Sequence, residues 1–376
     1  RTGIGWSSRG PGSEAGLMLA PMLLAAALQA PAPPGLAPGT VAIVQARIEA
    51  AMARLGVPGA AAAVVAREEL VWSAPFGEAD LENDVPVRTD TMFRLASVSK
   101  PITATAVMRL AEEGRLDLDA PVLRYCAEYP EKPWALTSRQ LLCHQGGVRH
   151  YRAGEMANTR RATSITEGLA LFKDDPLAFE PGTNVLYSTY GYTLLGCVAS
   201  VAAGQPFMDL LQEKVFEPAK MTATRLDDVR ELIPGRAQGY MRDGSGRLLN
   251  SALADMTLKV PGAGLCSTAP DVARFGAALL AGRLVSRETL REMLTAQSTR
   301  EGRATAFGLG LIVGSGGSRP EAWQTGGHQR VSTVLYLRPD DQVVVVILAN
   351  LEDVQTEILD LARSVADRVT ARNLPP

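Results

Sequence analysis

The sequence has few of the residues from which metal sites are built. Its 376 residues include only four cysteines and three histidines. The cysteines form no C-x-x-C pair, and the histidines form no H-E-x-x-H motif. We therefore expect no metal ion and no cofactor. The cysteines are interpreted as small buried apolar residues, with one disulfide left open, and they stand at Cys126, Cys143, Cys197 and Cys266.

An excess of charge and long apolar runs are also missing. The net charge of −2 and the pI near 6.1 give no basic field for nucleic acid. The apolar run Leu17–Leu28 is too short to span a bilayer, so we expect no stable membrane span. Residues 1–39 are interpreted as three successive parts: a tag or upstream read-through, a candidate signal peptide and a linker. If Leu17–Ala32 is a signal peptide, the protein is exported to the periplasm or medium; otherwise it is cytoplasmic.

What is present is the composition of a globular protein with a substantial core, at 46% hydrophobic and 21% charged residues. Periodicity predicts a helix near each end of the chain, Thr40–Leu55 and Asp353–Ala371. Strand patterns lie close to both ends, at 60–66, 69–73, 307–313, 322–325, 332–337 and 342–348. Between them the pattern is mainly helical, with helices predicted at 138–143, 165–172, 190–203 and 207–216.

This order of elements predicts an α+β fold. Strands at both ends imply one sheet assembled from the two termini, with a helical region inserted between them. The predicted sheet domain is discontinuous and comprises 40–96 plus 263–376. The predicted helical domain comprises 97–262 and carries the helix that follows Ser97.

Ser97 and Lys100 are the main candidate catalytic pair. They stand three residues apart where an apolar strand end runs into a predicted helix, so their side chains should share one helix face. Pro101 is tolerated in the first turn of a helix. A helix N-terminus favours an anionic intermediate beside Ser97, and a buried lysine with a lowered pKa can accept the serine proton. Because most basic residues here are arginines, a lysine in an apolar helix calls for a function or a partner.

Two later segments offer groups for the same chemistry. Tyr187 follows a Pro-Gly turn. A tyrosine in such a place commonly packs in the core, with its hydroxyl bonded to a neighbour. To act as a general acid or base, it would require a phenol pKa lowered by a cation such as Lys100. Gly326 and Gly327 follow a predicted strand, where a backbone N–H could complete an oxyanion hole with that of Ser97. No G-x-S-x-G motif occurs, which excludes the nucleophile elbow of α/β-hydrolases.

In this order the segments resemble the serine β-lactamase and penicillin-binding superfamily, specifically its class C branch. The S-x-x-K motif is Ser97–Lys100, the Tyr-x-Asn element falls at Tyr187–Thr189, and the K-T-G or H-T-G strand falls at Gln324–Gly326. Bacterial esterases with a β-lactamase fold and the mitochondrial β-lactamase-like proteins look nearest. The similarity runs from about Thr40 to Ala371, with supporting phrases at 116–121, 141–147, 179–183, 190–196 and 262–275.

The resemblance implies a β-lactamase/transpeptidase-like fold, with an antiparallel sheet flanked by helices. It implies that Ser97 is the nucleophile, that Lys100 assists its deprotonation, and that Tyr187 carries the proton to the leaving group. The backbone N–H groups of Ser97 and Gly327 would form the oxyanion hole. The substrate-binding residues that it implies are Thr189, Gln324, Thr325 and Gly326.

Two positions depart from the family pattern. Thr189 replaces the asparagine that helps to hold a substrate amide, and Gln324 replaces the lysine or histidine that helps to receive a substrate carboxylate. Both changes point away from β-lactams and D-Ala-D-Ala peptides and toward neutral esters. Other residues could supply a cation, namely Arg149, Arg152 or Arg330. The two histidines of this region, His144 and His150, are expected to be structural.

We therefore expect a serine ester hydrolase, a carboxylesterase that forms an acyl-serine intermediate with short- to medium-chain esters. Its partner would be a small-molecule ester, without nucleic acid, and a homo-oligomer is left open. The alternative is a D-Ala-D-Ala carboxypeptidase or a weak class C-type β-lactamase, which is the founding activity of the superfamily. A third reading is a non-enzymatic assembly role, which is associated with the mitochondrial branch.

Overall fold

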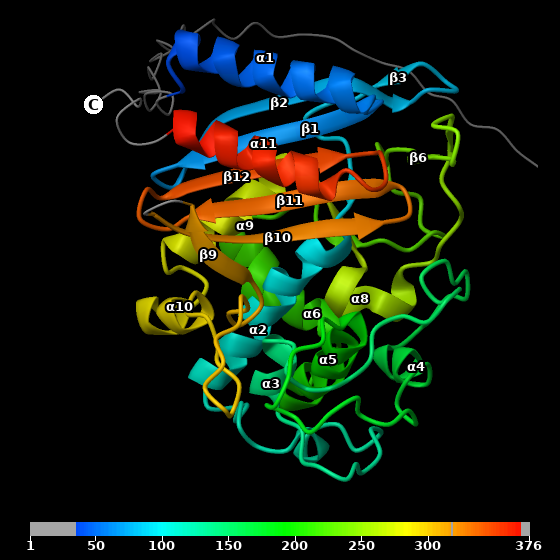
Figure 1. Cartoon of the computed structure of the whole chain (residues 1–376), viewed down its shortest axis with the longest axis vertical. Coiled ribbons are helices and arrows are strands. Elements are labelled where there is room, and N and C mark those ends of the chain that lie inside the picture. The colour runs from blue at the N-terminus through cyan, green and yellow to red at the C-terminus, as the bar shows by residue number, and fades with distance from the viewer. Residues whose placement is uncertain (1–34, 317–318, 370–376) are drawn as a thin grey trace, which may run out of the picture. The chain divides into compact units, whose positions relative to one another are not determined.

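Strands from both ends of the chain form one seven-stranded sheet in the computed structural model, which describes residues 35–316 and 319–369 (Figure 1). The strand order is β3-β2-β1-β12-β11-β10-β9, and all neighbouring pairs are antiparallel. This confirms the expected α+β fold with a sheet built from both termini. The strands are β1 (Gly59–Ala66), β2 (Glu69–Asp80), β3 (Val85–Pro86), β9 (Ile312–Gly316), β10 (Arg319–His328), β11 (Val331–Arg338) and β12 (Val343–Ala349).

The centre of the sheet is the pair β1 and β12, whose residues are all buried. Successive side chains of a strand point to opposite faces, so each strand feeds two separate clusters. On β1, Val65 packs into the cluster that contains Phe275 of helix α9 (Ala269–Leu280). Val64 packs with Val44 and Ile48 of helix α1 (Pro38–Leu55). Because both faces are covered, these strands read as continuous apolar runs rather than alternating ones.

Helices cover both faces of the sheet (Figure 1). Helices α1 and α11 lie on one face, and α9 lies on the other with the helices of the middle of the chain beyond it. The helices are α1 (Pro38–Leu55), α2 (Ser99–Glu112), α3 (Ser138–Leu142), α4 (Ile165–Leu169), α5 (Thr189–Ala203), α6 (Phe207–Leu211), α7 (Glu217–Ala219), α8 (Val260–Ala263), α9 (Ala269–Leu280), α10 (Arg287–Met293) and α11 (Gln355–Arg368).

The terminal helices are confirmed close to their predicted bounds. Helix α1 ends at Leu55 because Gly56 adopts a left-handed conformation, with φ of 60°. The strand predicted at 307–313 is wrong over most of its length, since β9 begins only at Ile312. Gly310 has φ of 97°, which a continuous strand does not accommodate. The candidate signal peptide and residues 370–371 of the last predicted helix lie outside the described residues.

The strand end expected before Ser97 is confirmed as β4 (Phe93–Arg94), which belongs to one of two small sheets of short strands. A three-stranded sheet has the order β4-β8-β5, and β6 pairs with β7. The strands are β4 (Phe93–Arg94), β5 (Arg225–Leu226), β6 (Tyr240–Arg242), β7 (Leu248–Asn250) and β8 (Leu265–Ser267). Pairing of β4 with β8 fixes the chain immediately before the 3₁₀ turn η1 (Ala96–Val98). The division into domains at 97 and 262 stays a prediction.

Across residues 35–316 and 319–369, no single helix has the length and apolarity needed to cross a bilayer. Helix α5 and the segment 207–219 meet the length and composition criterion only as a pair, and they are bent by 80° relative to one another.

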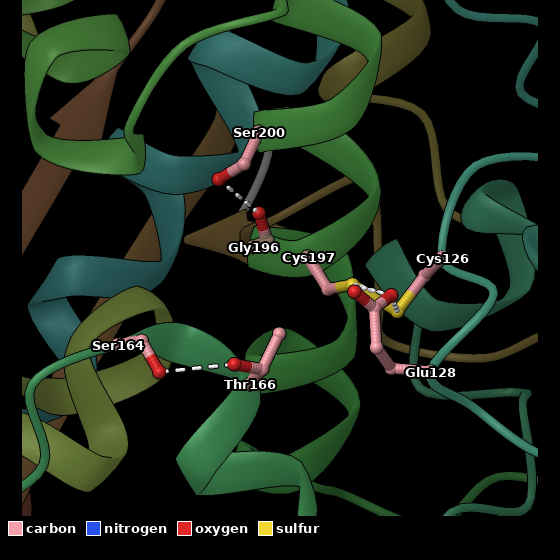
Figure 2. Close-up of a disulfide and its surroundings, with 7 residues drawn as sticks. All are labelled: Cys126, Glu128, Ser164, Thr166, Gly196, Cys197 and Ser200. Atoms are coloured by element: carbon pink, nitrogen blue, oxygen red, sulfur yellow. Dashed lines mark hydrogen bonds between the residues drawn. A yellow bond between two sulfur atoms is a disulfide. The ribbon is translucent and has the colours of Figure 1, made fainter.

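Cys126 and Cys197 form a disulfide that joins the segment after α2 to helix α5 (Figure 2). The possibility of one disulfide, left open by the sequence, is therefore realised, while Cys143 and Cys266 are free and buried. The carboxylate of Glu128 lies beside the bridge, with one oxygen 3.9 and 3.8 Å from the two sulfurs. Since the sulfurs are bonded to each other, this group of three offers no thiolate to a metal ion.

Replacing Cys126 and Cys197 together by alanine is expected to lower the free energy of unfolding by about 2–4 kcal/mol. The bridge closes a loop between residues 71 positions apart, and its loss enlarges the conformational freedom of the unfolded chain. Urea denaturation measures the effect. Cys143→Ala, which removes a buried free thiol, is the control for lost packing. A double variant no less stable than this control would show that the bridge contributes nothing.

Candidate active site

The Ser97 hydroxyl lies at the junction between η1 and helix α2, where the chain makes a strained reversal. Ala96 has φ of 46°, which is unusual for a residue with a side chain and is found where surrounding structure enforces it. Ala96 and Val98 are buried, whereas Ser97 itself is half-buried. The prediction placed Ser97 at the start of the helix; in the structure it precedes the first residue of α2 by two positions. The turn thus holds the hydroxyl partly accessible at a helix N-terminus.

Lys100 contacts three oxygen atoms although its side chain is fully buried. Its Nζ lies 3.0 Å from Ser97 Oγ, 3.1 Å from Thr189 Oγ1 and 2.9 Å from the Gly262 carbonyl oxygen. Burial holds the pKa of Lys100 well below 10.5. An uncharged amine has two N–H groups and one lone pair. The carbonyl and the threonine hydroxyl can accept both N–H groups, which leaves the lone pair for the Ser97 proton.

Tyr187 stands above this pair, with its ring centroid 4.7 Å from Lys100 Nζ. Burial is the main influence on the phenol and raises its pKa above 10, although hydrogen bonds with Ser97 and Gln324 act in the opposite direction. The expectation that a nearby cation lowers the phenol pKa is therefore wrong. The physical reason is that Lys100 is itself desolvated and holds its proton weakly, so it supplies little positive charge. Tyr187 rests as a neutral phenol that can donate a proton.

Strand β10 brings the predicted substrate-binding segment against the nucleophile. A Cβ at Gly326 would lie 2.5 Å from the Leu95 carbonyl oxygen and 3.1 Å from Ser97 N, so only glycine allows this approach. Gly327 follows it and is half-buried, as is Thr325. Gln324 is 3% exposed and donates its amide N–H to the Thr325 carbonyl oxygen at 2.8 Å, with Tyr187 Oη at 3.5 Å.

Thr189, also predicted to bind substrate, is placed differently. Its side chain is buried, and its hydroxyl is the one that Lys100 contacts at 3.1 Å. The structure therefore puts Thr189 beneath the lysine amine rather than on an open wall of the site. This contact and the one from the Gly262 carbonyl were not found by sequence reasoning, since both come from segments distant along the chain.

The two histidines of this region support Tyr187 and α5. His144 Nδ1 accepts the Ser188 N–H at 3.1 Å, and His150 Nδ1 accepts the Thr189 N–H at 3.3 Å. Their rings lie 4.3 and 5.6 Å from the Tyr187 ring. Burial lowers both pKa values, that of His150 to about 4, so both rings are neutral at pH 7. These contacts fit the structural role that the sequence predicts for them.

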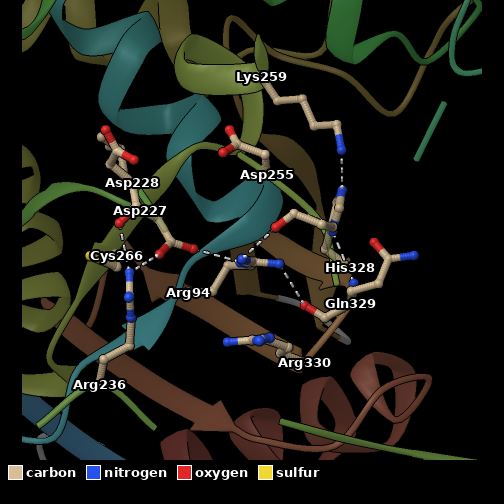
Figure 3. Close-up of polar contacts among 12 residues, drawn as sticks. Arg94, Asp227, Asp228, Arg236, Asp255, Lys259, Cys266, His328, Gln329 and Arg330 are labelled. Carbon is tan, nitrogen blue, oxygen red and sulfur yellow. Dashed lines mark hydrogen bonds and ion pairs between the residues drawn. The ribbon is translucent and has the colours of Figure 1, made fainter. Parts of the chain in front are cut away.

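Two of the three arginines considered as carboxylate anchors are paired with acidic residues. Arg149 contacts Glu155 and Asp175, and Arg152 contacts Asp175. The third, Arg330, lies on the turn after β10, where it lines a small cavity with Arg94, Asp227 and Arg236 (Figure 3). None of the three lies among the partners of Gln324 or Tyr187.

A larger cavity of about 340 Å³ is lined in part by Cys197 and Val201, and none of the proposed catalytic residues lines it. The volume of a cavity therefore does not identify the active site in this protein.

Comparisons with known proteins agree with this geometry. The family model described as Beta-lactamase matches residues 44–369. The chain is 31% identical over 297 residues to the serine beta-lactamase-like protein LACTB, mitochondrial, of Homo sapiens, covering 61% of this chain and 54% of that protein. It is 35% identical over 179 residues to esterase EstB of Burkholderia gladioli, and the match covers 43% of this chain and 45% of that protein. The D-amino acid amidase of Ochrobactrum anthropi, complexed with D-phenylalanine, shares the fold, with a TM-score of 0.76 and 24% identity. The superposition covers 88% of this chain and 99% of the amidase chain.

The chain spans about half the length of the first curated relatives that it matches. The family match nevertheless covers most of the described residues and includes every candidate catalytic residue. The antiparallel sheet, the helical layer and the S-x-x-K motif at the start of α2 are all consistent with it. The chain belongs to the Beta-lactamase family of serine hydrolases and penicillin-binding proteins.

Proposed function

We propose that the protein is a serine ester hydrolase, a carboxylesterase that forms an acyl-serine intermediate with short- to medium-chain esters. The observation that carries the proposal is the fully buried Lys100 amine, 3.0 Å from Ser97 Oγ. Desolvation lowers the pKa of this amine and so favours its uncharged form, which is the form that can take the serine proton. The same burial would be costly for a lysine with no chemical role.

The proposed mechanism is a sequence of proton and bond changes among these residues. Ser97 Oγ attacks the ester carbonyl carbon while its proton passes to Lys100 Nζ. The carbonyl oxygen becomes an oxyanion beside the backbone N–H groups of Ser97 and Gly327. When the intermediate collapses, the bond to the alcohol oxygen breaks, and that oxygen takes the Tyr187 phenol proton. Lys100 returns a proton to Tyr187. Water then attacks the acyl-serine, releases the acid and restores the Ser97 hydroxyl.

The preference for neutral esters rests on the neutral side chain of Gln324, which stands where the family pattern has a lysine or histidine. Gln324 is neutral, and its amide is engaged with Thr325 and Tyr187. Arg149 and Arg152 are bound to carboxylates. A β-lactam or a D-Ala-D-Ala peptide carries a carboxylate that would meet a neutral amide at this position. The similarity to esterase EstB supports this choice.

Amide hydrolysis is the second candidate, as a D-Ala-D-Ala carboxypeptidase or a weak class C-type β-lactamase. It is favoured by the likeness to penicillin-binding protein 4* of Bacillus subtilis, 26% identical over 302 residues. The chemistry from Ser97 to the acyl-enzyme is the same for an amide. The two candidates differ in whether the site attracts a carboxylate.

Parallel kinetics on p-nitrophenyl butyrate and nitrocefin decide between them. We expect kcat/KM for the ester to exceed that for nitrocefin by about 10²-fold or more, the equivalent of one missing charged hydrogen bond. Gln324→Lys restores a cation on β10 and should raise nitrocefin turnover while leaving that of the ester little changed. Equal turnover of the two substrates by the unmodified protein would favour amide hydrolysis. Ser97→Ala provides the background rate.

We further propose that the protein is exported. The disulfide between Cys126 and Cys197 supports this, because such bridges form and persist in oxidising compartments. The free thiols of Cys143 and Cys266 are buried and so are protected from oxidation there. Cell fractionation of a tagged full-length protein tests the location; recovery only from the cytoplasm would contradict export.

A further inference from the structure

A second buried lysine lies close to the proposed oxyanion strand and is not used by the mechanism above. Lys259 is 0% exposed, and its Nζ lies 3.2 Å from Nε2 of His328, which is 4% exposed (Figure 3). His328 is the residue after Gly327 on β10, and Lys259 ends the 3₁₀ turn η4 (Thr257–Lys259) that leads into α8. Helix α8 contains Gly262, whose carbonyl contacts Lys100. The pair therefore bridges the two segments that hold the proposed base and the proposed oxyanion hole.

The hydrogen bonds of His328 fix where its proton lies. Its Nδ1 accepts the Gln329 backbone N–H at 2.9 Å, so Nδ1 carries no hydrogen. A neutral ring then carries its hydrogen on Nε2, which points to Lys259 Nζ. For this contact to be a hydrogen bond, the amine of Lys259 must accept with its lone pair. Lys259 itself donates an N–H to the Met156 carbonyl oxygen at 2.6 Å.

Charged and aromatic groups lie close to the Lys259–His328 pair. The Tyr151 ring lies 5.4 Å from Lys259 Nζ, Arg94 on β4 repels a positive charge there, and Asp255 before η4 attracts one. Burial is the largest influence and lowers the pKa of Lys259 to about 7. Burial also holds the pKa of His328 well below 6.5, and the positive charge of Arg94, or of Lys259 when it is protonated, acts in the same direction; Lys100 and His150 are the other titratable groups that face the ring. Near neutral pH it is therefore the lysine that gains or loses a proton.

We propose that Lys259 is a positioning residue whose uncharged amine holds His328, and through it the turn after Gly327, in the arrangement that acylation of Ser97 needs. The role in catalysis rests on the proposed function. The turn is fixed on both sides, since the Gln329 N–H binds His328 and the Gln329 carbonyl oxygen accepts from Arg94 at 3.0 Å. Once protonated, the Lys259 amine has no lone pair to accept a hydrogen bond. An N–H of Lys259 and the Nε2–H of His328 then face each other, and both are donors. His328 must move its hydrogen to Nδ1 and release the Gln329 N–H, which frees the turn beside Gly327.

Nitrogen NMR of the histidine rings tests the hydrogen-bond arrangement without any substrate. The signal is assigned by its loss in His328→Gln. We expect Nε2 of His328 to be protonated and Nδ1 unprotonated at pH 8, with a change between pH 8 and pH 6 that is absent in Lys259→Met. A proton on Nδ1 at pH 8, or the same change in Lys259→Met, would overturn the proposal. Circular dichroism and a melting curve establish that each variant is folded.

The rate at which a fluorophosphonate labels Ser97 tests the link to reactivity for any serine hydrolase, whatever its substrate. Between pH 5.5 and 9 we expect an ionisation near pH 7 in the unmodified protein and its loss in Lys259→Met, with the rate at pH 8 lowered about 10-fold. Lys259→Arg keeps a positive charge but offers no lone pair to His328, so Ser97 should be labelled more slowly in this variant than in Lys259→Met. Rescue by arginine, or an unchanged profile, would refute positioning. Exposed Lys220 supplies the control, Lys220→Met.

The outcomes separate this inference from the proposed function. If the protein labels but hydrolyses no ester, the carboxylesterase proposal fails while the labelling profile still decides the role of Lys259. If ester hydrolysis is found and Lys259→Met leaves both the labelling and kcat/KM profiles unchanged, the inference alone fails.

Discussion

Ser97→Ala is expected to lower kcat on p-nitrophenyl butyrate by at least about 10⁴-fold, leaving only what binding and the oxyanion hole contribute. The substitution removes the single atom that forms the acyl bond. It leaves the backbone N–H of Ser97 in place, and Lys100 keeps its contacts with Thr189 and Gly262. Because Ser97 is half-buried and loses only one oxygen, the melting temperature should change little. Steady-state kinetics and a melting curve measure the two effects, and mass spectrometry detects any trapped acyl-enzyme.

Ser99 offers a matched control two residues away. It is buried, and its hydroxyl accepts the Leu265 backbone N–H at 3.3 Å; this hydroxyl is not among the hydrogen-bond partners of the Lys100 amine. Ser99→Ala should keep acyl-enzyme formation while costing about 1 kcal/mol of stability for the lost hydrogen bond. If Ser97→Ala still formed an acyl-enzyme, the nucleophile would be another residue and the proposed mechanism would be wrong.

The sequence was sufficient for those parts of the fold that depend on local pattern. The apolar runs of β1 and β12 predict buried strands, and the helix that ends at Gly56 follows from periodicity and a C-terminal glycine. Strands of two or three residues, such as β4 and β5, are too short to carry a period. The strand end before Ser97, which is β4, was expected from its apolar residues, but its pairing with β8 joins segments distant along the chain and could not be predicted.

The same distinction applies to the candidate site. Ser97 and Lys100 meet because residues three apart share a helix face, which spacing alone predicts. The contacts of Lys100 with Thr189 and Gly262 join residues 89 and 162 positions apart and depend on how the helices pack. The direction of the Tyr187 pKa was mispredicted for a related reason: it depends on burial and on the charge state of Lys100, neither of which is local. Pairing of Cys126 with Cys197 is likewise set by tertiary structure.

Lys100→Met should have the second largest effect on activity, lowering the acylation rate by about 10³-fold through loss of the general base. In the unmodified protein the rate rises as pH rises through the lowered pKa of Lys100, because the uncharged amine is the active form. In the variant the part of this rise that belongs to Lys100 should disappear, while the ionisation near pH 7 that is assigned to Lys259 remains. Stopped-flow release of p-nitrophenol between pH 5.5 and 10 measures both. Lys100→Arg, which cannot lose its proton at these pH values, should be equally inactive, so retained activity in it would exclude a general base.

Stability should change in the opposite direction, and this separates lost chemistry from lost structure. Between the lowered pKa of Lys100 and 10.5, the unfolded chain binds a proton that the folded chain does not, so stability rises with pH in that window. Below the window the full cost of a buried charge is present. Methionine fills a similar volume without charge, and we expect Lys100→Met to be more stable by about 1–3 kcal/mol at pH 7, with a flatter dependence on pH. A variant that is inactive and also less stable would mean that the Lys100 contacts hold the fold together, and that the loss of activity says nothing about proton transfer.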